Sequence, residues 1–256
     1  MTSTPPSLAA KRPRTGVPAG QRILGLETGG DHLSVALLVW PDGQPASGMV
    51  LLDEVVAHRG GRHTDMVLAM IDEVLARHEV RPADLALVGV GRGPGSFTGI
   101  RVGLSTALAL EVATGVSAWP VCSLAAMACH VPRGVALPLI DARKGEVYGG
   151  LFRCNPGIAP EVMLAPGART CEATLAAAHA AAEDVLVFGS GAQVHGVASP
   201  VPPAFHAGAA RHVAWLAALA WDEAGRDARA APALDAAYLR RSEAEVARDI
   251  TFAGSA

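Results

Sequence analysis

Two kinds of apolar pattern alternate along the 256-residue chain. Short, continuous apolar runs bounded by turn residues predict strands at residues 23–27, 33–40, 49–57, 85–90 and 116–121. Apolar residues that recur every three or four positions predict helices at residues 64–78 and 100–114, with a third helical stretch from Ser123. The first half therefore predicts an α/β fold.

The second half repeats this order in shortened form. Strands are expected at residues 135–141, 147–153, 161–164 and 184–188, and helices at 174–182 and 209–224. Each half reads βββαβα, with an acid at the end of its first strand (Glu27, Asp141) and a glycine turn after its fourth. The repeat predicts two similar domains, followed by a helix that crosses back to the first. The expected boundaries are a disordered leader at 1–21, domains at 22–118 and 119–205, the crossing helix at 209–224 and a tail at 226–256.

The most distinctive stretch is the glycine turn within residues 91–101, which separates a predicted strand from a predicted helix. Its glycines allow positive φ and close approach of another surface, and Ser96 or Thr98 is placed to cap the helix. Pro94 and Phe97 break the dinucleotide-binding rhythm, and no Gly-Lys-Ser/Thr follows as in a P-loop. A plain strand–turn–helix would also collect glycines, so both interpretations stay open.

Charge and cysteine content narrow the function classes. A formal net charge of −3 provides no global basic field for nucleic acid. The four cysteines form no Cys-x-x-Cys pair, which favours reduced thiols and a cytoplasmic location. The leader lacks the apolar core of a signal peptide, and no apolar run is long enough to span a membrane.

The duplicated order resembles the actin, Hsp70 and sugar-kinase superfamily, whose members have two ribonuclease-H-like halves. Within it, residues 22–241 resemble the bacterial TsaB family. The resemblance is carried by residues 93–101, His63-Thr64, Asp141-Ala142-Arg143-Lys144-Gly145-Glu146-Val147-Tyr148 and Tyr238-Leu239-Arg240.

The resemblance implies a non-catalytic subunit for tRNA modification. TsaB proteins partner the catalytic subunit TsaD in making N6-threonylcarbamoyladenosine beside the anticodon of tRNAs that read codons starting with A. A small P-loop ATPase, TsaE, joins them. TsaB alone forms a homodimer, and tRNA is expected to be held only through the complex, with no membrane involved.

The residues are consistent with catalysis elsewhere. A metal site needs a second histidine one helical turn after His63, and Val67 stands there, so we expect no catalytic residue and no metal. Glu27 with Asp141, Arg143 and Lys144 makes a poor adenosine pocket, which predicts no cofactor but leaves weak nucleotide binding open. The alternative function is a superfamily enzyme, either an ATP-dependent phosphotransferase or a metal-dependent hydrolase.

Two sets of residues are candidates for function. The motif set, which either positions an interface or remains from an ancestral cleft, is Glu27, Thr28, Gly93, Gly95, Ser96, Thr98, Gly99, Arg101, Asp141, Arg143, Glu146 and Tyr148. For the turn at Asp141, local pairing with Arg143 is an equal alternative. The partner-interface set comes from the two helices of the first half, which are apolar on more than one face. It comprises Met66, Val67, Met70, Ile71, Val74, Ile100, Gly103, Leu104, Ala107 and Leu108. Alternatively, the smaller domain covers the second face.

Overall fold

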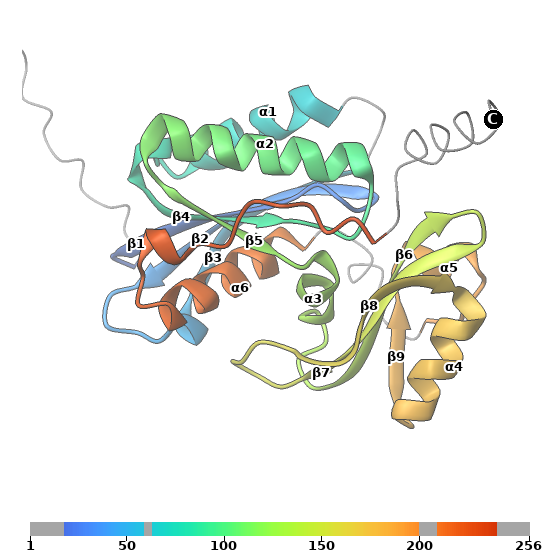
Figure 1. The fold of residues 1–256 in the computed structure, drawn as a ribbon. Helices are drawn as coiled ribbons and strands as arrows, with labels where there is room; N and C mark the ends of the chain where they lie inside the picture. The colour runs from blue at the N-terminus through green and yellow to red at the C-terminus, as the bar shows by residue number, and fades with distance from the viewer. Residues whose placement is uncertain (1–17, 59–62, 200–208, 240–256) are drawn as a thin grey trace, which may run out of the picture.

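The computed structural model describes residues 18–58, 63–199 and 209–239. These residues form two α/β lobes, each built on one mixed sheet (Figure 1). We call the five-stranded sheet with its helices the first lobe, and the four-stranded sheet with its helices the second lobe.

The first sheet contains β1 (Gly20–Glu27), β2 (His32–Pro41), β3 (Val50–His58), β4 (Leu85–Gly91) and β5 (Ser117–Val121). Its strand order is β3-β2-β1-β4-β5, in which β1, β2 and β3 are antiparallel and β4 and β5 run parallel to β1. Its main helices are α1 (His63–Arg77), α2 (Phe97–Thr114) and α6 (Ala210–Glu223).

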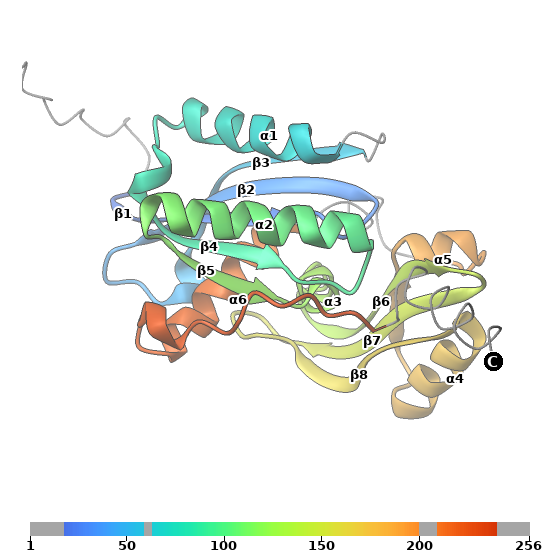
Figure 2. The same ribbon diagram turned by 45° about the horizontal axis from the view of Figure 1, so that its top comes forward.

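Helices cover both faces of the first sheet. α1 and α2 lie on one face and α6 on the other, as Figures 1 and 2 show from two directions. One core cluster joins α1 and α2 to the sheet and another joins α6 to it. Because both faces are covered, the inner strands are buried along most of their length and read as continuous apolar runs.

α6 lies unusually close to the sheet because small residues face it. A Cβ added at Gly89 would lie 2.7 Å from the Val213 carbonyl oxygen and 2.8 Å from Ala217 Cβ. A Cβ at Gly25 would overlap the Ala210 carbonyl oxygen. The two strand glycines and the alanines of α6 thus set the distance between helix and sheet.

The second lobe repeats the first with one strand fewer. Its strands are β6 (Gly134–Arg143), β7 (Glu146–Cys154), β8 (Glu161–Thr170) and β9 (Val185–Phe188), in the order β8-β7-β6-β9. Its helices are α4 (Cys171–Ala181) and α5 (Ser190–Val194), while α3 (Ser123–Ala128) packs between β6, β7 and α6. The predicted fold, two ribonuclease-H-like βββαβα halves, is confirmed.

Several element ends differ from the sequence prediction. β1 begins at Gly20, inside the predicted leader, whereas β5 ends at Val121, where the strand was predicted to end. β8 extends to Thr170, whose side chain then caps α4. Short 3₁₀ helices occur at Ala46–Gly48, Pro82–Asp84 and Ala228–Ala230. Most of the predicted leader and the tail beyond residue 239 lie outside the described residues.

Candidate functional site

The glycine turn joins β4 to α2. Gly93 has a φ of +94°, a conformation that glycine adopts readily and L side chains rarely do. Ser96 caps α2 by accepting a hydrogen bond from the Gly99 N–H at 3.4 Å. Thr98 is exposed in the first turn of the helix, so Ser96 is the cap of the two that the sequence offered.

This turn is hydrogen-bonded to the turn that follows β1. The Thr28 hydroxyl donates to the Gly99 carbonyl oxygen at 2.7 Å. The Ser96 N–H donates to the Gly29 carbonyl oxygen at 2.8 Å. Two loops that are about seventy residues apart in sequence are therefore held as one unit.

The glycines of this unit make the close approach possible. A Cβ at Gly95 would overlap the Gly29 carbonyl oxygen, and a Cβ at Gly103 would overlap the Thr28 hydroxyl. The space beside the β1–β2 turn that faces α2 is therefore filled by the chain itself. Gly103, which the sequence placed in the partner interface, instead makes room for Thr28.

Glu27, at the end of β1, is only 4% exposed. Its Oε1 accepts the Gly29 N–H at 2.8 Å, and a Cβ at Gly91 would overlap its carboxylate. Burial raises the pKa of the nearby Cys122 thiol. The negative charge of the Glu27 carboxylate raises it too, whereas the positive charge of Arg92 lowers it. Glu27 thus helps to hold the β1–β2 turn, and Gly91 packs closely against its carboxylate.

Two further segments attach to the glycine turn. The Gly93 N–H donates to Ser123 Oγ at 3.2 Å, and the Ser123 N–H donates back to the Gly93 carbonyl oxygen at 2.9 Å. The Ala237 N–H donates to the Arg92 carbonyl oxygen at 2.8 Å, which brings the last described residues across the turn. α3 and the C-terminal segment are therefore fixed by the same turn that starts α2.

An exposed aromatic stack lies at this junction. The rings of Phe97 and Tyr238 stack with centroids 5.0 Å apart, and the Arg101 guanidinium lies 4.5 Å from the Phe97 centroid. Phe97 is 40% and Tyr238 46% exposed. Phe97 is not among the predicted site residues, although an aromatic side chain among small residues at a helix start could have indicated it.

In the second lobe, the β6–β7 turn is held by contacts within the turn and by one hydrogen bond to α5. Asp141 Oδ1 accepts the Arg143 N–H at 2.8 Å, the Arg143 Nε lies 3.5 Å from Asp141 Oδ2, and the Asp141 N–H donates to Ser190 Oγ at 3.2 Å. Glu146 pairs with Arg143 in the strand register, and Tyr148 packs against the core beside α3. These contacts match the local alternative for Asp141 and Arg143.

The described residues offer neither a membrane-spanning helix nor a metal-binding cluster. None of the helices in residues 18–58, 63–199 and 209–239 has the length and apolar character needed to cross a membrane. Over the same ranges, no three side chains of His, Cys, Asp or Glu are grouped so that they could hold a metal ion.

Comparison with known proteins identifies the relatives of this chain. A family model described as TsaD, tRNA N6-adenosine threonylcarbamoyltransferase, matches residues 54–162. The protein TsaB of Escherichia coli is 35% identical over 131 residues, which cover 50% of this chain and 53% of the relative. That of Bacillus subtilis is 28% identical over 143 residues, which cover 55% and 59%. Over about half of their length, the chain is similar to these TsaB proteins.

The matches leave part of each protein uncovered. The chain spans about half the length of the curated proteins from Bacillus subtilis, Escherichia coli and Haemophilus influenzae that it matches, and these three are named tRNA threonylcarbamoyladenosine biosynthesis protein TsaB. Among solved structures, YeaZ from Pseudomonas aeruginosa superposes with a TM-score of 0.68 over 86% of this chain and 100% of that chain, at 23% identity. At that identity the likeness supports the fold.

The predicted partner residues of this TsaB relative lie mostly in its own core. The side chains of Val67, Met70, Ile71, Val74, Ile100, Leu104 and Ala107 are at most 8% exposed and belong to the cluster between α1, α2 and the sheet. Met66 is half-buried against that cluster, and Gly103 is buried. For the buried residues the prediction is wrong, because side chains that pack on the sheet have no surface left for a partner.

Other residues of the same helices are exposed and apolar. On α2, Phe97, Leu108 and Val112 are 40%, 49% and 80% exposed. With Arg101 they recur at intervals of four and seven residues, which places them along one face of the helix. On α1, Leu68 is 55% exposed. Leu108 is the one predicted interface residue that is exposed.

Proposed function

We propose that this TsaB relative is a non-catalytic subunit of the machinery that makes N6-threonylcarbamoyladenosine in tRNA. In this proposal it binds and activates a TsaD-type catalytic subunit, a TsaE-type ATPase joins the complex, and tRNA is held through the assembly in the cytoplasm. The names of three curated relatives, from Bacillus subtilis, Escherichia coli and Haemophilus influenzae, support the proposal, because each is called a tRNA threonylcarbamoyladenosine biosynthesis protein.

The observation that carries the proposal is the exposed apolar face of α2. We call Phe97, Arg101, Leu108 and Val112 the α2 stripe. Aromatic and arginine side chains are enriched at protein interfaces, and an apolar row on an exposed helix favours association. The stripe is the proposed contact for the TsaD-type subunit, and for a second copy of this chain when no such subunit is present.

The packing of the two turns supports a positioning role for the motif residues. The glycine turn is hydrogen-bonded to the β1–β2 turn, to α3 and to the C-terminal segment, and it also starts α2. Any shift in this unit would move the stripe. Of the two enzyme alternatives, an ATP-dependent phosphotransferase requires phosphates to bind beside the β1–β2 turn, where Gly95 and Gly103 already make close contacts.

The test is co-purification of this chain with the TsaD homologue of the same organism. The variants Leu108→Asp and Val112→Asp place a charge in the proposed contact, which we expect to weaken binding at least tenfold while the chain stays folded. Ile158→Asp is the matched control, because Ile158 is 58% exposed on the second lobe, away from α2.

Binding at full strength by both α2 variants would reject the α2 stripe as the contact. If the wild-type chain does not bind the TsaD homologue at all, the proposed function is wrong. Tight binding of ATP by the isolated chain, measured by calorimetry, would favour the enzyme alternative. Light scattering of the wild type and both variants reports separately on the homodimer.

A further inference from the structure

A pocket lies where the two lobes meet, at the end of the second sheet opposite the β6–β7 turn. In the strand register, Gly134 pairs with Cys154 at this end and Arg143 with Glu146 at the other. The pocket is therefore separate from the turns that carry the motif residues. None of its lining residues is part of the α2 stripe, which is the proposed contact for the TsaD-type subunit.

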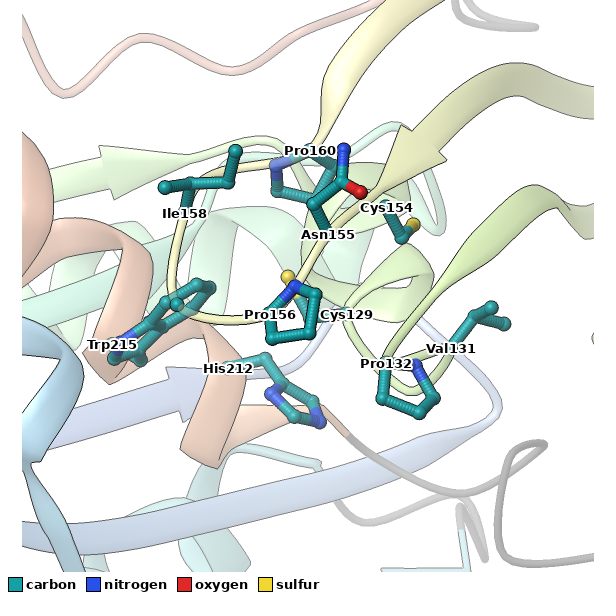
Figure 3. Close-up of a pocket in the computed structure, with 11 residues that line it drawn as sticks. Cys129, Val131, Pro132, Cys154, Asn155, Pro156, Ile158, Pro160, His212 and Trp215 are labelled. Atoms are coloured by element: carbon teal, nitrogen blue, oxygen red, sulfur yellow. The ribbon is translucent and has the colours of Figure 1, made fainter.

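Three segments form its walls. The hairpin between β7 and β8 supplies Pro156 and Ile158, α6 supplies His212 and Trp215, and the chain after α3 supplies Cys129 and Pro132. Figure 3 shows Trp215 and His212 on one side of the space and Val131 and Pro132 on the other. The volume is about 230 Å³. A dry cavity of about 150 Å³ holds a benzene ring, so this one has room for a bicyclic aromatic molecule.

The hairpin also reaches the first lobe. A Cβ built at Gly157 would lie 3.5 Å from Ser47 Cβ, an ordinary van der Waals distance. Ser47 lies in the 3₁₀ helix Ala46–Gly48, which packs against α6. One wall of the pocket is thus a segment of the second lobe that rests on the first.

The described side chains that line the pocket are uncharged at neutral pH. Burial raises the pKa of Cys154 to about 11 and raises that of Cys129 further, so both thiols stay protonated. Each thiol donates to a backbone carbonyl oxygen, that of Ala125 for Cys129 and that of Ala128 for Cys154. Burial lowers the pKa of His212 to about 3, which leaves the imidazole neutral. A charged ligand would lose its hydration here without an opposite charge among these residues.

We infer that this pocket binds a neutral, flat, bicyclic aromatic molecule between the two lobes. The indole of Trp215 and the rings of Pro132 and Pro156 offer flat apolar surfaces for stacking. The His212 imidazole and the Asn155 amide supply the few polar groups that orient a ligand. A bound molecule contacts both α6 and the hairpin, so it stabilises the contact between the lobes.

Indole is the probe, titrated into the full-length chain by calorimetry. We expect saturable binding with a dissociation constant below about 1 mM, because a probe with few atoms binds weakly. Bound indole should also raise the melting temperature of the protein. Ile158→Asp brings a carboxylate to the rim of the pocket and should weaken indole binding at least tenfold. Val112→Asp, on the α2 stripe, is the control and should bind indole as the wild type does.

A charged analogue tests the requirement for neutrality. Indole-3-acetate has the same rings and a carboxylate, and should bind at least tenfold more weakly than indole. The inference is overturned if indole fails to saturate the wild type, if Ile158→Asp binds it at wild-type strength, or if the acid binds as well as indole. None of these results bears on TsaD binding, because the pocket and the α2 stripe are separate.

Discussion

Acid should destabilise this protein through one pair of half-buried histidines. His130, which follows α3, and His212, on α6, meet edge to face with ring centroids 4.6 Å apart. Burial lowers the pKa of His130 to about 4, and the Arg211 charge contributes. Burial likewise lowers the pKa of His212 to about 3, with contributions from His130 and Arg211. Arg211 itself is paired with Glu54 of β3.

The sign and size of the effect follow from linkage. An unfolded histidine has a pKa of about 6.5, so below that pH the unfolded chain binds protons that the folded chain does not, and stability falls. Between pH 8 and pH 5 each histidine should lower the free energy of unfolding by about 2 kcal/mol, and the pair by about 4 kcal/mol. The loss continues until the pH approaches the folded pKa values.

The perturbation is the double variant His130→Phe/His212→Phe, which keeps two rings in contact but removes both titrations. Urea unfolding followed by circular dichroism at pH 8, 6.5 and 5 gives the free energy of unfolding of each protein. The wild type should lose about 4 kcal/mol more than the double variant between pH 8 and pH 5. His179→Phe, at an exposed position on α4, is the control for replacing a histidine outside this pair.

Equal slopes for the wild type and the double variant would refute the reasoning, because the remaining titratable groups are common to both. A double variant that is less stable than the wild type at every pH would not contradict the prediction. That result reports on packing, whereas the prediction concerns the dependence on pH.

Two further predictions concern packing and thiol chemistry. Gly89→Ala should lower the free energy of unfolding by about 1–3 kcal/mol, because the added methyl group meets α6. Gly48→Ala is the control and should not lower it, because the added methyl group would have Gln44 Cβ as its nearest neighbour at 3.4 Å. The midpoints of urea unfolding measure both effects. Cys154 is 3% exposed and its pKa is raised to about 11, so on the order of one in a thousand of its side chains should be a thiolate at pH 8. It should therefore react with iodoacetamide far more slowly in the native protein than in urea, which peptide mass spectrometry measures.

The fold could be predicted from the sequence because the patterns that indicate it are local and occur in both halves. The apolar runs and helical spacings recur in the same order in both halves, and sheets covered on both faces produce such runs. Element ends were less accessible. α2 begins at Phe97 because the Ser96 hydroxyl caps it, and β8 continues to Thr170 because it pairs with β7 that far.

The candidate surface was harder to predict. α2 carries apolar residues on nearly every face, so periodicity does not show which of them meet the sheet. The structure divides them, with Leu104 and Ala107 inside and Leu108 and Val112 outside. The contact between Gly95 and Gly29 and the pocket at Trp215 each join segments distant in sequence, which local patterns do not connect.

The position of α6 in the chain has a consequence for synthesis on the ribosome. One face of the first sheet is covered by a helix that is translated only after the entire second lobe. Until α6 emerges, the nascent first sheet presents Ile23, Leu38, Leu87 and their neighbours without the helix that buries them. The second lobe, contiguous in sequence, needs no such late segment for its own sheet. The order of emergence thus makes the first half of the chain the later one to be completed.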